Sequence, residues 1–210
     1  RLKIDSLLES VKNYVKSKPK RLDWNKLNLG NIGYRIVRKN ESRFIDKQVA
    51  SWNLDLEPRP NHYDRSITVT TPLQKAGAYL LKAKMKDGNT SRIIVWLNNT
   101  AIVQKRMSQK AWFYIADSRT GAPLEKINVE FFGYDQDWVR GSRSYQIKTR
   151  QFAEFSDKTG QITLSAKEFS RDYKWLIIAR GNNRLAYHGF SNIWYSTYYD
   201  SQYTQNKTYI

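Results

Sequence analysis

The sequence predicts a mainly β protein, with two antiparallel β-sandwich modules preceded by a small helical extension. Short runs of strand-forming residues recur from residue 51 onward, separated by turn-forming clusters. Two turns share an Asp-x-(x)-Thr-Gly pattern, at Asp117–Leu124 and Asp157–Gln161. In such turns Asp bonds back to the backbone and Gly supplies a positive φ. No strand–helix–strand alternation occurs, which argues against a doubly wound nucleotide-binding sheet.

Composition limits the class of protein. At 210 residues, with 40% hydrophobic and 14% aromatic content, the chain can form packed cores in one or two domains. It has no cysteine, which excludes disulfides, thiolate metal sites and cysteine nucleophiles and favours a bacterial or intracellular source. No apolar run reaches the roughly 20 residues that span a bilayer. Because the sequence begins at Arg1 rather than Met, we expect a piece of a longer protein.

The net charge of +17 is typical either of a protein that binds a polyanionic partner or of one with a cationic, solvated surface. Residues 1–50 carry 13 basic and 5 acidic side chains, a net of +8, whereas residues 111–190 carry 12 and 9, a net of +3. The excess thins along the chain and forms no block of five or six like charges. We therefore expect no nucleic acid among the partners, and a charge-driven nucleic-acid binder is the least favoured alternative.

Residues 1–50 are predicted to be a basic, helical N-terminal extension. Residues 4–15 have helical spacing, with lysine and glutamate opposite an apolar face made of Ile4, Leu7, Leu8, Val11 and Val15. Pro19 is expected to end this helix. We expect the helix to pack on its own protein rather than lie on a membrane. Residues 32–37 are predicted as a short strand and residues 44–52 as a helical turn or two.

Residues 51–109 are predicted to form a β-sandwich or partial sandwich. Strand-like runs are expected at 66–70, 78–85, 92–97 and 101–104. Asp87-Gly88-Asn89 indicates a hairpin between the second and third runs. The runs form one predicted meander, with too few strands to be stable alone. Trp52 and Leu54 are expected to complete its core.

Residues 110–190 are predicted to form the second sandwich, and residues 191–210 an aromatic linker to a next domain. Strands are expected at 111–116, 127–133, 145–155, 161–164, 174–180 and 184–189. Residues 134–144 are predicted as a long exposed loop or hairpin tip. The aromatic residues of the linker are Trp194, Tyr195, Tyr198, Tyr199, Tyr203 and Tyr209.

The sequence shows no constellation that indicates catalysis or ligand binding. His62 and His188 are far apart, and neither has a second histidine or an acidic cluster at metal-ligand spacing. No nucleophile elbow supports a Ser-His-Asp site. Asp135 and Asp137 alternate with the aromatic residues Tyr134 and Trp138. This pattern fits either a sugar- or calcium-binding loop or a solvated hairpin tip, and we favour the hairpin tip. We therefore predict no catalytic, cofactor-binding or metal site, no cofactor and no enzymatic activity.

The order of four segments resembles the N-terminal macroglobulin-like region of bacterial alpha-2-macroglobulins. The segments are Ser51–Leu56, Pro72–Leu81, Asp117–Leu124 and Asp157–Gly160. In that family a Gly-x-Tyr strand closes one sandwich, and a Val-x-Asp-x-x-Thr-Gly-x-Pro turn opens the next. The final Asn206–Ile210 looks like the lead-in to the family's Thr-Asp-Arg-Pro-x-Tyr-x-Pro-Gly segment. The resemblance covers residues 51–210, within which residues 134–144 look like an insertion.

The resemblance implies macroglobulin-like, that is immunoglobulin-like, sandwiches in a non-catalytic scaffold fragment of a protease-trapping endopeptidase inhibitor. The family's bait region and its Cys-Gly-Glu-Gln thioester are not in this sequence. The implied partners are neighbouring macroglobulin-like domains of the same chain, and target proteases and a nearby membrane through the full-length protein. The implied location is extracytoplasmic (periplasmic, cell-surface or secreted) in a bacterium. The alternative is a cell-surface adhesin or carbohydrate-binding β-sandwich that uses residues 134–144.

Overall fold

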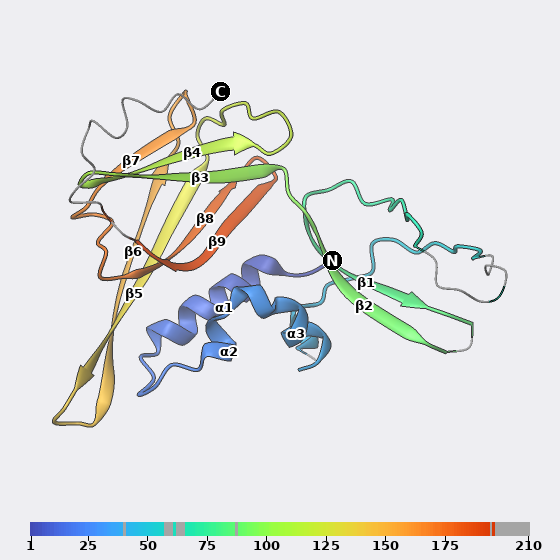
Figure 1. The fold of residues 1–210 in the computed structure, drawn as a ribbon, viewed down its shortest axis with the longest axis horizontal. Coiled ribbons are helices and arrows are strands. Elements are labelled where there is room, and N and C mark those ends of the chain that lie inside the picture. The colour runs from blue at the N-terminus through green and yellow to red at the C-terminus, as the bar shows by residue number, and fades with distance from the viewer. Residues whose placement is uncertain (40, 57–60, 62–65, 87, 194, 196–210) are drawn as a thin grey trace.

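The computed structural model describes residues 1–39, 41–56, 61, 66–86, 88–193 and 195. The protein is mainly β, with antiparallel sheets and a few helices near the N-terminus, and the sequence predicts this much correctly (Figure 1). Figure 1 shows a group of helices, a two-stranded hairpin on one side of it, and a larger pair of sheets on the other.

Helix α1 (Ile4–Lys16) confirms the helical periodicity of the first segment. All five predicted apolar side chains of this helix are buried, because residues spaced i, i+3, i+4 and i+7 share one face. The helix is capped at Ser17, two residues before Pro19. Lys12 is buried as well. The expectation that the lysines of this helix all lie opposite the apolar face is therefore wrong for Lys12.

Residues 32–37 form helix α3 (Ile32–Val37), so the predicted strand is wrong. Ile32 and Ile36 are both buried in the same cluster as α1, and their i, i+4 spacing places them on one helical face. Helix α2 (Trp24–Leu27) and the 3-10 turn η1 (Leu29–Asn31) precede α3. A helical turn is predicted at 44–52, but the structure has the 3-10 turn η2 earlier, at Ser42–Phe44. Residues 46–56 form no regular element.

The strands in the described residues form three antiparallel sheets. The two-stranded sheet pairs β1 (Gly77–Lys84) with β2 (Thr90–Leu97). The three-stranded sheet has the order β3-β4-β7, from Thr100–Met107, Lys110–Asp117 and Gln161–Ser165. The four-stranded sheet has the order β6-β5-β8-β9, from Ser144–Phe155, Asn128–Val139, Lys174–Gly181 and Arg184–Asn192.

The two larger sheets share one apolar core, which contains a group of buried aromatic rings in mutual contact: Phe113, Phe131, Phe169 and Trp175. Helix α1 and its neighbours cover the other face of the four-stranded sheet, where Phe132, Leu176 and Ile178 join their cluster. Both faces of β5 and β8 are therefore buried. This double burial explains the unbroken apolar run at 175–179, which would alternate with polar residues if one face met solvent.

The predicted meander of residues 66–104 is wrong in two places. Residues 66–70 form no strand, and β3 pairs with β4 rather than with β2. The chain changes sheet at Asn98, whose carbonyl oxygen accepts a hydrogen bond of 2.8 Å from the Ser118 hydroxyl. Ile102 on β3 then packs against the core between the larger sheets. Pairing with β4 thus places this half-buried side chain on a core to which no described residue of the β1–β2 hairpin contributes.

The β1–β2 hairpin packs against the N-terminal helices instead. Its Ala78, Leu80, Ile94 and Trp96 join the cluster around α1. The side chain of Leu54, expected to complete this core, is 52% exposed. The first 50 residues therefore supply the apolar partner that was expected from residues 51–56.

Residues 134–144 are strand for most of their length, so the prediction of a long loop is wrong, whereas the alternative of a hairpin tip is confirmed at residues 140–143. Strand β5 continues to Val139, β6 begins at Ser144, and the two pair along this whole stretch. The hairpin projects beyond the rest of the protein, at the lower left of Figure 1. We call residues 135–148 the arm and residues 140–143 its tip. Most of the predicted linker lies outside the described residues; Tyr195, which is described, donates its hydroxyl to the Phe169 carbonyl oxygen.

Candidate functional site

The first Asp-Thr-Gly turn is held together by Asp117. One carboxylate oxygen, Oδ1, accepts from the Arg119 amide at 3.0 Å and from the Thr120 amide and hydroxyl at 3.1 Å each. The other, Oδ2, accepts from Arg184 Nη1 at 2.9 Å. The backbone donors of Thr120 and Arg119, with the Arg184 side chain, lower the pKa of Asp117 to about 2. Both carboxylate oxygens are therefore engaged within the protein.

The second turn is built the same way around Asp157. Its Oδ1 accepts from the Gln161 amide at 2.9 Å, the Thr159 amide at 2.8 Å and the Thr159 hydroxyl at 2.7 Å. The Gln161 amide and the Thr159 side chain are the main influences that lower the pKa of Asp157. As predicted, turn geometry accounts for both aspartates.

The two turns meet at Ile115 on β4. Its amide donates to the Gly160 carbonyl oxygen at 2.7 Å, and its own carbonyl oxygen accepts from the Leu124 amide at 2.9 Å. Gly160 has φ +74°, and a Cβ there would lie 2.6 Å from the Ile115 oxygen. Only glycine fits this position. The sequence shows each turn separately, but not that one residue joins them.

A second polar cluster fastens α1 to the four-stranded sheet, and sequence reasoning missed it. Lys12 Nζ lies 2.5 Å from Glu130 Oε1 and 2.5 Å from Glu9 Oε1. Arg180 Nη1 lies 2.9 Å from Glu130 Oε2, and Arg180 Nε lies 2.9 Å from Asp5 Oδ1. One feature of the sequence does indicate that Lys12 is buried: it stands four residues after Leu8 and so falls on the apolar helical face.

Glu130 is the centre of this cluster. Burial opposes its ionisation and is the largest single influence on its pKa. The hydrogen bonds and charges of Lys12 and Arg180 together outweigh burial, so the pKa of Glu130 lies below its ordinary value. The carboxylate is paired and enclosed, which indicates a structural anchor rather than a general acid or base.

The residues considered for chemistry are not brought together. His188 lies on β9, with its Nδ1 3.0 Å from the Gly189 carbonyl oxygen and 3.3 Å from Ser191 Oγ. His62 lies outside the described residues. No group of three or more His, Cys, Asp or Glu residues in the described part of the chain could hold a metal ion. The described helices include none that is long and apolar enough to cross a bilayer.

Two hollows lie beside β9. One, of about 440 Å³, is lined by α2 and η1 on one side and by Tyr134, Lys174 and Phe190 on the other. The other, of about 550 Å³, lies between Trp96, Ile102 and Tyr187. The Tyr134 hydroxyl is buried and has no hydrogen-bond partner among the described residues, and burial raises its pKa to about 12. His188 lines both hollows, together with Lys174 in the first and Ser118 in the second, but the hydrogen bonds of its ring among the described residues go to Gly189 and Ser191.

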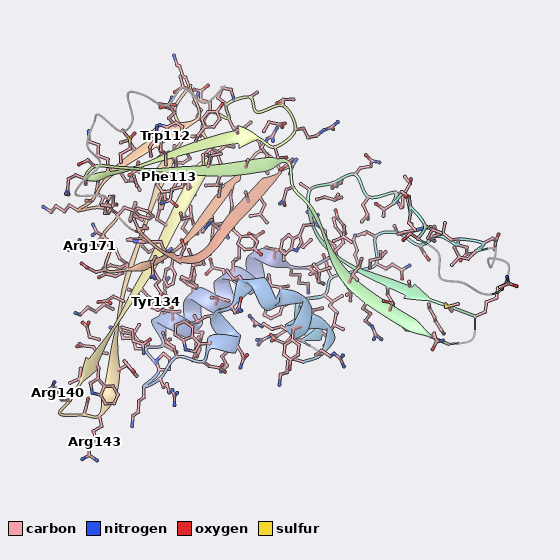
Figure 2. All side chains as sticks on the ribbon, in the orientation of Figure 1. Trp112, Phe113, Tyr134, Arg140, Arg143 and Arg171 are labelled. Carbon is pink, nitrogen blue, oxygen red and sulfur yellow. The ribbon has the colours of Figure 1, made fainter. Side chains whose placement is uncertain are left out.

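The arm carries the predicted aromatic and acidic residues. Trp138 is 53% exposed, and its ring centroid lies 4.9 Å from that of Tyr145 on the opposite strand. Asp137 Oδ2 lies 2.6 Å from Lys148 Nζ, so this aspartate has a cationic partner. Tyr134, at the base of the arm, is buried rather than exposed. Figure 2 shows Arg140 and Arg143 at the far end of the arm.

Comparison with protein-family models and with curated proteins finds no match for this chain. The function is therefore inferred from the contacts described above.

Proposed function

We propose that this chain is a non-catalytic scaffold segment of an alpha-2-macroglobulin-like endopeptidase inhibitor, an extracytoplasmic bacterial protein that traps proteases. The observation that carries the proposal is the junction of the two Asp-Thr-Gly turns at Ile115. Their aspartates accept hydrogen bonds from the protein's own backbone, so the motifs hold the ends of neighbouring strands together.

The sheets support the finer part of the proposal, a macroglobulin-like sandwich over about residues 110–190. Two antiparallel sheets enclose one apolar core, as the two layers of a sandwich do. Strand β3 belongs to the same core through Ile102, which favours extending this module back to Thr100. The neighbouring modules of the parent chain are its proposed partners, together with the trapped proteases.

The proposal is tested with the full-length protein that contains this segment. After incubation with a moderate excess of trypsin, trapped protease should co-elute with the inhibitor on size exclusion. Trypsin blocked at its active site should elute free, because trapping requires cleavage. Co-elution of both forms, or of neither, would contradict a cleavage-triggered trap.

A second candidate function is carbohydrate binding by the arm. The observation that favours it is the exposed ring of Trp138 beside Tyr145, since aromatic rings stack on sugars. A glycan array tests it directly, with Trp138→Ala as the matched variant. An array without hits, or unchanged binding by Trp138→Ala, would exclude this function.

A further inference from the structure

The arm and the loop before α2 form one surface. The Tyr145 amide on the arm donates to the Lys20 carbonyl oxygen at 3.2 Å. This hydrogen bond places the arm beside the loop of residues 18–21. We call the two segments together the arm surface, comprising Lys18, Lys20, Arg21, Trp138, Val139, Arg140, Arg143 and Tyr145.

The arm surface is cationic and its charges are not neutralised. Its basic side chains are all exposed: Lys18, Lys20, Arg21, Arg140 and Arg143. None of them forms an ion pair with a described residue, whereas Lys148 farther down the arm is paired with Asp137. A concentration of unpaired positive charge attracts an anionic partner.

The same surface exposes apolar side chains. Trp138 is 53% exposed, Val139 38% and Tyr145 36%. Trp138 and Tyr145 face each other in register on the two strands of the hairpin. Tryptophan and tyrosine beside lysine and arginine are the residues that favour the headgroup region of a bilayer.

The position of this surface is fixed by the core. Trp138 lies on the same face of β5 as Tyr134, and Tyr145 on the same face of β6 as Ile147, because alternate residues of a strand share a face. Tyr134 and Ile147 are both buried in the cluster around α1. The base of the arm is therefore anchored, and its distal end projects into solvent (Figure 2).

We infer that the arm surface docks on an anionic phospholipid membrane. Charge complementarity supports this occupant, and the aromatic and aliphatic side chains supply the apolar contact that a soluble polyanion does not need. Shape supports it as well, since a projecting hairpin end can enter a deformable headgroup layer. The inference goes beyond the scaffold role and does not depend on it.

Vesicle sedimentation of the 210-residue protein tests the inference. Vesicles of phosphatidylcholine with about 30 mol% phosphatidylglycerol are compared with pure phosphatidylcholine, at low salt and at about 0.5 M NaCl, where screening is strong. We expect binding to the anionic vesicles only, weakened by salt.

Two pairs of variants locate the binding surface. Arg140→Asn with Arg143→Asn should weaken binding roughly 10- to 30-fold, given about 1 kcal/mol for each basic residue at an anionic membrane. Asparagine suits position 143, where φ is +45°. Arg119→Asn with Arg171→Asn, an equal charge change at exposed turns away from the arm, should bind as the unmodified protein does. Trp138→Ala should also weaken binding, whereas Phe155→Ala, which removes a 64% exposed ring, should not.

Three results would overturn the inference. The first is equal loss of binding in the arm variants and their controls. The second is equal binding to neutral and anionic vesicles. The third is tight binding to soluble heparin or DNA without binding to anionic vesicles, which would identify the arm surface as a site for a soluble polyanion.

Discussion

Arg184 Nη1 lies 2.9 Å from Asp117 Oδ2, so the hairpin between β8 and β9 is fastened to the turn that follows β4. The same guanidinium donates to the Asn99 carbonyl oxygen at the start of β3. One arginine thus joins the ends of both larger sheets. This contact gives the Asp-Thr-Gly motif a structural purpose beyond its own turn.

We expect the stability of the protein to fall in acid partly through Asp117. Its pKa is about 2 in the folded protein against an ordinary 3.8, so it contributes stability above about pH 4 that is lost as the pH falls towards 2. Asp117→Asn should remove part of this dependence. The measurement is the urea midpoint between pH 2 and 5. The control is Asp46→Asn, at an exposed site without a side-chain hydrogen bond among those described, and it should leave the dependence of the urea midpoint on pH unchanged. Equal dependence in the unmodified protein and in both variants would contradict the role given to Asp117.

Glycine at position 160 should be irreplaceable, whereas Gly121 should tolerate alanine better. Both have positive φ, +74° and +72°, but only at Gly160 would a Cβ meet the protein, 2.6 Å from the Ile115 oxygen. We expect Gly121→Ala to cost about 1 kcal/mol and Gly160→Ala about 3 kcal/mol or more. Urea unfolding of the two variants measures the difference. Equal costs would show that the two turns are not held together at Ile115.

Glu130→Leu should be strongly destabilising, by about 2 to 3 kcal/mol, because it leaves Lys12 buried with only Glu9 beside it. The double variant Lys12→Met with Glu130→Leu should be more stable than Glu130→Leu alone, since the buried charge that has lost its buried partner is then removed. Asp5→Asn, which breaks an exposed contact to Arg180, should cost about 0.5 kcal/mol or less. Additive effects of Lys12→Met and Glu130→Leu in a double-mutant cycle would contradict a coupled pair.

Trp175 and Trp138 should differ sharply in their effect on stability. Trp175 is fully buried between the larger sheets, and Trp175→Ala should cost about 3 to 5 kcal/mol. Trp138 projects from the arm, so Trp138→Ala should leave the melting temperature nearly unchanged. Calorimetric melting temperatures of the two variants test this difference, and a large loss for Trp138→Ala would mean that the Trp138 ring itself packs on the body of the protein.

Most of the strands and the first helix could be predicted, because their periodicity is local. Residues 32–37 could not, since a six-residue segment with Ile32, Ile36 and Val37 fits either a strand or a helix, and burial of Ile32 and Ile36 in the cluster that contains the apolar face of α1 favours the helix. Residues 66–70 alternate like a strand but pair with no described strand. Alternation therefore indicates a strand only where a partner is available.

The polar contacts show the same division between local and distant information. The Asp117 and Asp157 turns are contained within a few residues and were predictable from type and spacing. The Lys12–Glu130 pair spans 118 residues, and the Asp117–Arg184 pair spans 67. Sequence spacing places Lys12 on the apolar helical face but does not identify the partner in either pair, because the partners depend on how the sheets and helices pack.

The central claim, a scaffold segment of a protease trap, is tested most directly by the size selectivity of inhibition by the full-length protein. A trapped protease is enclosed but keeps its active site. With the inhibitor in excess, we expect trypsin to lose most of its activity on a large protein substrate while retaining its activity on a small chromogenic peptide. Equal loss on both substrates, or no loss on either, would contradict the claim.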